Sequence, residues 1–199
     1  MIEIKAFDRW GTENIKVSDA GLVDYINLNP KIVPKTGARY VGQKFHKSQT
    51  FIVERLINKM MVTGHKAKKH FKTSYPFSGK GSKAYDIVKK TFEIIEQKTK
   101  KNPIEVFVKA LENAAPREEV IAIEYGGARY PKAVECAPQR RIDLVLRLMT
   151  QGAFHKAFNS KKDIISSLAD EIIAAYNMSN ASNAISKKLE LERQADASR

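Results

Sequence analysis

Cationic and aromatic side chains alternate in the segment KIVPKTGARYVGQKFHK, residues 31–47. Lysine and arginine neutralise phosphates and release counterions, and rings such as those of Tyr40 and Phe45 can stack on unpaired bases. The segment therefore predicts contact with a nucleic acid. The cations expected to make this contact are Lys35, Arg39, Lys44 and Lys47. The alternative is a flexible basic tail, and both descriptions hold if the segment becomes ordered on binding.

A second basic stretch, HKAKKHFKTSYPFSGKGSK at residues 65–83, interrupts a helical pattern. We expect a long exposed loop, which is the second candidate for binding nucleic acid on charge alone. The lysines concerned are Lys66, Lys68, Lys69 and Lys72. Ser78 to Ser82 resembles a phosphate-binding loop, but the G-x-x-x-x-G-K-[ST] spacing and a preceding strand are missing. We therefore interpret it as a basic turn.

A third group of rings and cations lies near residue 130. Val120 to Tyr125 and Ala128 to Cys136 are rich in strand formers, and the glycines between them favour a tight turn. The expected hairpin tip contains Tyr125, Gly126, Gly127, Arg129, Tyr130 and Lys132. An isolated two-stranded arm is marginal in water, so a projecting arm implies a partner. The alternative is a hairpin folded back onto the core.

Three arginines follow the hairpin. Arg140 and Arg141 lie in the first turn of an expected helix, where cations oppose the helix dipole. Binding of an external anion explains the position of these two arginines better than a contribution to stability does. Arg147, seven residues after Arg140, lies two turns further along the same helix face.

Residues for catalysis or metal binding do not converge in the sequence. The histidines at positions 46, 65, 70 and 155 are scattered, and one cysteine is too few for a zinc knuckle. Cys136 has no nearby histidine and is expected to be buried. The adjacent carboxylates Glu118-Glu119 and Asp170-Glu171 look like ordinary surface pairs. We therefore expect no enzyme, no metal site and no cofactor.

Charge is concentrated in one third of the chain. The 199 residues contain 35 lysines and arginines against 22 acidic residues, a net charge of +13. Residues 31–90 hold 15 of these cations with only Glu54 and Asp86, while the remaining residues are balanced. This distribution predicts a polyanionic partner, and a merely basic surface is the alternative.

Apolar spacing and turn signals predict a mainly α, six-helix domain with a protruding β-hairpin between the third and fourth helices. Ser48 is the expected cap of the first helix, and Asn102 with Pro103 begins the third. A helix opens at Lys161 to Asp163, and the last begins near Ser182. The first two helices are expected to bury Val53, Leu56, Ile57 and Met60, and Ala84, Val88, Thr91, Phe92 and Ile95.

The domain division follows from the same patterns. Residues 1–47 lack a sustained helical period and are interpreted as an N-terminal extension, basic in its second half. Residues 48–199 form the helical RNA-binding domain, with the hairpin at 120–136. No apolar run approaches the roughly 18 to 20 residues of a membrane span, and no secretion signal is recognised at the N-terminus. The single cysteine agrees with a reducing compartment.

Long motifs of the helical region carry a family resemblance. The run NPIEVFVKALENAAPREEV, then YGGARYP and APQRRIDLVLRLM, resembles the universal small-subunit ribosomal protein seven family. The similarity begins at VERLINKMM, continues through SLADEIIAAYN and SNASNAISKKLELERQADASR, and covers about residues 38–199. The segments EIKAFDRW and VSDAGLVDYINL look like the archaeal and eukaryotic branch, and we favour an archaeal source.

The resemblance implies a structural role in the cytoplasmic ribosome. Members bind the 3′ major domain of small-subunit ribosomal RNA, organise assembly of the head, and lie near the exit site beside tRNA, mRNA and other head and platform proteins. The basic N-terminal segment, the hairpin tip and the Pro-x-Arg-Arg step at Arg140 and Arg141 are the matching RNA-binding positions. Loop 65–83 departs in length from the bacterial pattern.

Two other classes of protein share some of these sequence features. A helical DNA-binding regulator also uses basic helices, but it requires a compact recognition helix and usually a dimer interface. An RNA-modifying enzyme requires a metal or cofactor constellation that the sequence lacks. Equal affinity for ribosomal RNA and duplex DNA at elevated salt would favour the regulator.

Overall fold

The computed structural model describes residues 4–37, 39–66, 69–70, 74 and 77–199. Within these residues, six α-helices and a hairpin between the third and fourth confirm the expected fold class. The helices are α1 (Ile52–Met60), α2 (Gly81–Thr99), α3 (Pro103–Ala114), α4 (Pro138–Ala157), α5 (Ile164–Tyr176) and α6 (Asn183–Asp196). The hairpin strands are β3 (Glu118–Tyr125) and β4 (Ala128–Glu135). No described helix is long and apolar enough to cross a membrane.

The predicted cap of the third helix is confirmed, and the helices expected to open at Lys161 to Asp163 and near Ser182 begin at Ile164 and Asn183. The side chain of Asn102 accepts from Ile104 N and precedes Pro103, the first residue of α3. Asp163 caps α5, and Ser182 caps α6. The prediction for Ser48 is wrong, because residues His46–Gln49 form a separate 3-10 helix, η2, and α1 begins only at Ile52.

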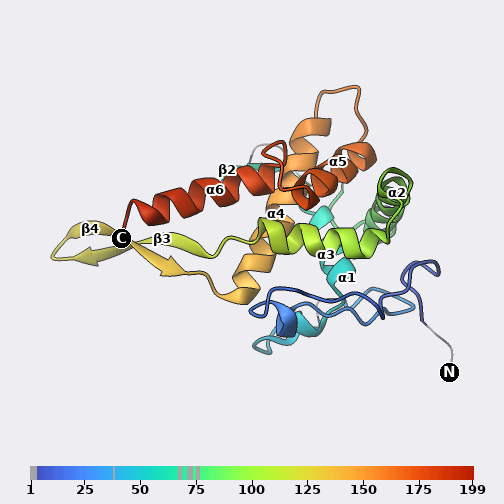
Figure 1. Ribbon diagram of the computed structural model, residues 1–199, viewed down its shortest axis with the longest axis horizontal. Helices are drawn as coiled ribbons and strands as arrows, with labels where there is room; N and C mark the ends of the chain where they lie inside the picture. The colour runs from blue at the N-terminus through green and yellow to red at the C-terminus, as the bar shows by residue number, and fades with distance from the viewer. Residues whose placement is uncertain (1–3, 38, 67–68, 71–73, 75–76) are drawn as a thin grey trace.

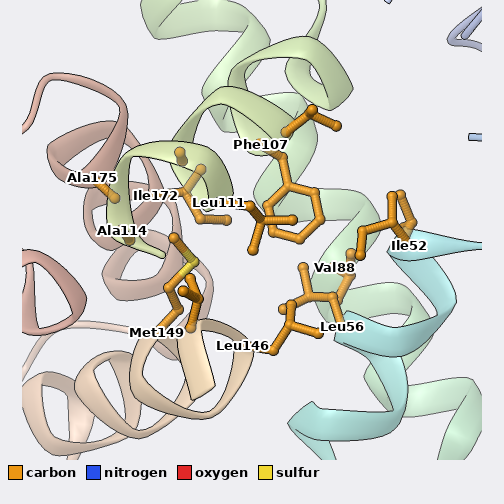
Figure 2. Close-up of a cluster of buried hydrophobic side chains, with 14 of the residues drawn as sticks. Ile52, Leu56, Val88, Phe107, Leu111, Ala114, Leu146, Met149, Ile172 and Ala175 are labelled. Atoms are coloured by element: carbon orange, nitrogen blue, oxygen red, sulfur yellow. The ribbon is translucent and has the colours of Figure 1, made fainter. Parts of the chain in front are cut away.

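The core lies around α3, which packs against α2, α4, α5 and α6. Figure 2 shows Phe107 and Leu111 of α3 between Val88, Leu146 and Ile172, which come from α2, α4 and α5. The apolar faces predicted for the first two helices are all buried. Burial of these side chains removes their apolar surface from water, and this stabilises the helices that carry them.

The N-terminal segment contributes to the same core. Ala6, Trp10, Leu22 and Ile26 are buried in it, although no helical periodicity marks them. Two short 3-10 helices, η1 (Val23–Tyr25) and η2, and extended pieces carry the chain past α1 and α3, along the lower side of Figure 1. The described residues before 31 therefore pack on the helices, whereas most of those described from 31 to 47 are exposed. The separation of residues 1–47 as an extension stays a prediction.

The stretch predicted as a long loop, 65–83, contains two short strands and the start of α2. Strands β1 (His65–Lys66) and β2 (Lys69–His70) pair antiparallel, which the prediction of a loop did not include. Gly79 has a φ of 76°, and α2 begins at Gly81, which confirms the basic turn. Lys68 and Lys72 lie outside the described residues, as do the side chains of Lys66 and Lys69.

The hairpin is an arm that projects from the helices. Its register pairs Glu118 with Glu135 and Tyr125 with Ala128, and its far half is exposed on both strands. Helix α6 packs along its base, chiefly on β3, and Figure 1 shows the C-terminus beside it. Arg199 Nη2 donates to the Glu118 carboxylate at 2.6 Å. The projecting interpretation therefore holds rather than the folded-back one.

Gly152 allows α4 to approach α5 and α6 closely. A Cβ at this position would lie 2.8 Å from Asn183 Cβ and 3.2 Å from the Glu171 carboxylate. Gly152→Ala should therefore lower the free energy of unfolding by about 1–3 kcal/mol, although alanine is the better helix former. Gly81→Ala is the control: its Cβ meets no atom within 4 Å, so it should be neutral or stabilise by up to about 1 kcal/mol. Circular dichroism during urea unfolding measures both, and a stabilising Gly152→Ala would contradict the tight contact.

Candidate nucleic-acid interface

Two of the predicted cations, Lys35 and Arg39, lie in one groove, which is lined by residues between 31 and 50. The groove has a volume of about 490 Å³. Its lining residues are Lys31, Val33, Lys35, Thr36, Arg39, Tyr40, His46, Gln49 and Thr50. Lys35 and Arg39 are exposed, and Tyr40 is half-buried beside them. The structure therefore gathers cations and a ring into one concave site, whereas Lys44 is exposed outside its lining.

A buried carboxylate on α1 holds one wall of this groove. Glu54 is fully buried, and its Oε1 accepts from both the backbone N and the hydroxyl of Thr36, each at 2.7 Å. The opposite wall is η2, which follows Phe45 with its left-handed φ of 62°. Both walls are thus attached to the helical core, through Glu54 and through the step from η2 into α1.

Lys47 belongs to a second basic site, the Asp143 cluster, which we define as Lys47, Arg55, Lys59, Asp143 and Arg147. Asp143 on α4 accepts from Lys47 Nζ at 2.8 Å and from Arg55 Nη2 at 3.0 Å. Burial alone would raise the pKa of Asp143, but these hydrogen bonds and charges outweigh it and lower the pKa below its usual value. The carboxylate is therefore ionised at neutral pH.

Three cations interact with that one carboxylate, and the charge of Arg147 acts on Lys59 beside them. Burial lowers the pKa of Lys59, and the charges of Lys47 and Arg147 lower it further, while Asp143 acts in the opposite direction. Arg147 is half-buried, and its Nε has no hydrogen-bond partner. Excess positive charge held in a partly desolvated place is unfavourable until an anion arrives. The cluster is thus suited to a phosphate group.

Arg140 and Arg141 have partners within the protein. Arg140 makes two hydrogen bonds to Glu119, at 2.5 and 2.6 Å, and remains exposed. Arg141 is buried and donates to Pro116 O at 3.0 Å and to Asp19 at 2.7 Å. Glu119 and Asp19 therefore supply negative charge to these arginines from within the protein, and their contact with an external anion stays a prediction. Contact of Arg141 with RNA would also require its side chain to leave this site.

The hairpin tip presents rings more than charge. Tyr125 is 82% exposed and Tyr130 is 59% exposed. Arg129 lies 3.5 Å from Glu124 on the opposite strand, which offsets its charge. Gly126 and Gly127 have φ values of 56° and 82°, as the tight turn requires. The tip suits stacking or apolar contact better than phosphate binding, and Lys132 adds one exposed cation to it.

Groups for redox, acid-base or metal chemistry do not assemble in the described part of the chain. No cluster of three histidine, cysteine or acidic side chains there could hold a metal ion. Cys136 is buried, and burial, with the nearby Glu119 carboxylate, raises the pKa of its thiol to about 11. The thiol is therefore protonated and unreactive at neutral pH.

Sequence reasoning missed three members of the Asp143 cluster. Arg55 and Lys59 are four residues apart and lie on one side of α1, a spacing that could have indicated a shared basic face. Asp143 gave no signal, because its role depends on α4 packing beside α1. A site of this kind depends on the packing of distant elements, so the sequence alone does not indicate it.

The fold and its charged sites define a mainly helical, basic protein that carries a β-hairpin arm. Comparison with protein families matches residues 22–199 to "Ribosomal protein S7p/S5e". The chain belongs to this family, and it is a protein of the small ribosomal subunit rather than an enzyme. The recognition of the family from its motifs is confirmed.

Curated relatives agree over the whole chain. The chain is 52% identical over 198 residues to "Small ribosomal subunit protein uS7" of Nanoarchaeum equitans, covering 100% of each. It is 47% identical to the protein of the same name from Archaeoglobus fulgidus, covering 99% of this chain and 96% of the relative. Identity to that of Methanothrix thermoacetophila is 45%, covering 98% and 100%. These relatives are archaeal, as the N-terminal motifs suggested.

Proposed function

We propose that the protein binds the 3′ major domain of small-subunit ribosomal RNA and organises assembly of the head. The observation that carries this proposal is the surplus of cations in the Asp143 cluster beside the groove lined by Lys35 and Arg39. Neutralisation of phosphates there releases counterions, which supplies affinity for RNA. Shape and ring contacts then select one folded RNA, since a helical duplex offers few readable base edges.

The hairpin has a separate role in this proposal. Its tip lies near the exit site and contacts tRNA and mRNA through exposed rings, with Lys132 for a phosphate. Neighbouring head and platform proteins complete the surroundings, and the protein works in the cytoplasm as part of the ribosome. The exposed tyrosines and the weak net charge of the tip support contact by stacking.

The proposal is tested by removing two cations from the groove. The double variant Lys35→Ala and Arg39→Ala should weaken binding to a 3′ major domain RNA fragment. It should also reduce the slope of log K against log salt by about 1.4 to 1.8, from roughly 0.7 to 0.9 for each lost phosphate contact. Neither side chain is buried, so stability should be unchanged. Filter binding at several salt concentrations measures this effect.

A matched control removes the same charge elsewhere. Lys98 and Lys162 both pair with Asp170 at the contact between α2 and α5, away from the groove residues. Replacing both by alanine should leave the salt slope within experimental error. If the two double variants weakened binding equally, general charge rather than this surface would explain the affinity. Similar affinity of the wild type for duplex DNA would contradict the ribosomal RNA proposal.

A further inference from the structure

The groove over residues 31–50 has the dimensions of a small-ligand site. Its volume of about 490 Å³ falls within the roughly 300–1,000 Å³ of pockets that enclose a small molecule. Contact with the outside of a duplex needs only cations on a convex or flat surface. The hollow form of this site therefore calls for a ligand that enters it.

The chemistry of the lining matches one nucleotide. Lys31, Lys35 and Arg39 provide positive charge for phosphate oxygens, and the Tyr40 ring provides an apolar face for a base. Gln49 and His46 add polar side chains that can bond to the edge of a base. Within a duplex the base faces are covered by their neighbours, so only an unpaired nucleotide can use all of these groups.

The two walls are positioned before a ligand binds. Thr36 is held on the buried Glu54 by two hydrogen bonds of 2.7 Å. On the other side, Ser48 N donates to Phe45 O at 2.9 Å, and Thr50 N donates to Lys47 O at 3.2 Å. Because a preformed site loses less conformational entropy on binding, this groove is suited to select a ligand by shape.

We propose that this groove binds a single unpaired nucleotide of the bound RNA, with the base against Tyr40 and the phosphates against Lys35 and Arg39. The inference rests on the proposed RNA-binding function. It adds that the RNA at this site is single-stranded and that its recognition includes a base face as well as the phosphates.

Comparison of two RNAs tests the proposal with the full-length protein. Fluorescence anisotropy measures binding of a labelled uridine octanucleotide and of a labelled eight-base-pair RNA duplex at one salt concentration. Tyr40→Leu should weaken binding of the octanucleotide about tenfold and leave duplex binding within about twofold, since stacking is lost only for the unpaired strand. An equal effect on both RNAs, or no effect on either, would overturn the proposal.

Phe158→Leu is the matched control. The Phe158 ring is 40% exposed at the end of α4 and does not line the groove. Its loss should change octanucleotide binding by less than about twofold. If both variants lost affinity equally, exposed rings in general would be responsible and the groove would not be the site.

A crosslinking measurement makes the result independent of how the variants fold. An octanucleotide containing 4-thiouridine is irradiated with the wild-type protein, and the attached peptide is identified by mass spectrometry. Crosslinks should fall within residues 31–50, whereas crosslinks confined to the hairpin would overturn the proposal. Binding of the wild type to the ribosomal RNA fragment is scored separately, so loss of that binding identifies a failure of the proposed function instead.

Discussion

Replacing Asp143 by asparagine should lower the free energy of unfolding by about 3 kcal/mol. The side chain of Arg55 is only 3% exposed, and asparagine would leave its guanidinium buried without a counterion. Breaking a buried ion pair in this way costs roughly 3–5 kcal/mol. The lower value applies because Asp143 is 34% exposed and Arg55 keeps its hydrogen bond to Tyr25 O.

The same carboxylate makes stability depend on pH in a defined direction. The pKa of Asp143 is lower in the folded protein than its usual value. Such a group stabilises the fold above its unfolded pKa and loses that contribution as the pH falls through its folded pKa. The advantage of the wild type over Asp143→Asn should therefore be complete near neutral pH and shrink in acid. Urea unfolding at several pH values measures the difference.

Asp170→Asn is the matched control for this prediction. Asp170 is 35% exposed, almost the same as Asp143, but its partners Lys98 and Lys162 have side chains that are 50% and 45% exposed. The loss should stay below about 1 kcal/mol, because water solvates the released lysines. Equal losses in the two variants would contradict the role assigned to the buried Arg55.

Helices and their ends could be predicted because their signals are local. The apolar face of α2 was predicted residue by residue, the Asn102 cap was predicted, and α5 and α6 begin next to Asp163 and Ser182, where the sequence indicated helix starts. A cap or an apolar stripe depends on residues within four positions of each other. Tertiary contacts change such features little, so the sequence alone was informative.

Burial of charged residues could not be predicted in the same way. Glu171 was interpreted as half of an ordinary surface pair, yet it is fully buried, and Arg141 is buried beside Asp19, 122 residues earlier. A charged group is buried where partners from other elements meet it, and those partners are distant in the sequence. Trp10 and Leu22 were missed for a related reason, since their segment has no periodicity.

Glu171 is expected to be the second position with a large effect on stability, because it joins the last three helices. Its Oε2 accepts from Lys156 Nζ of α4 at 2.5 Å. Its Oε1 accepts from the Ser182 hydroxyl at 2.8 Å and from Ala184 N at 3.3 Å, at the start of α6. Glu171→Gln keeps the oxygen for α6 but places an amide donor opposite the lysine. The free energy of unfolding should therefore fall by about 2–3 kcal/mol.

Thermal unfolding followed by circular dichroism should show this loss as a lower Tm, by roughly 4–12 °C for a chain of this size. Glu190→Gln is the matched control, because Glu190 pairs with Lys187 on the exposed side of α6. That surface pair should contribute less than about 0.5 kcal/mol. If both variants lost the same stability, the contact between α4, α5 and α6 would not depend on the buried carboxylate.

A double-mutant cycle separates the ion pair from the other bonds of Glu171. Lys156→Met alone leaves a buried carboxylate with only Ser182 and Ala184 as partners, so it should be costly. In the Glu171→Gln background the same substitution removes the donor that faces the new amide, and its cost should be smaller. The expected coupling is about 1–2 kcal/mol. Additive losses would show that Lys156 stabilises the protein through its bond to Ala181 O. The Glu171 carboxylate would then be stabilised only by its hydrogen bonds from Ser182 and Ala184.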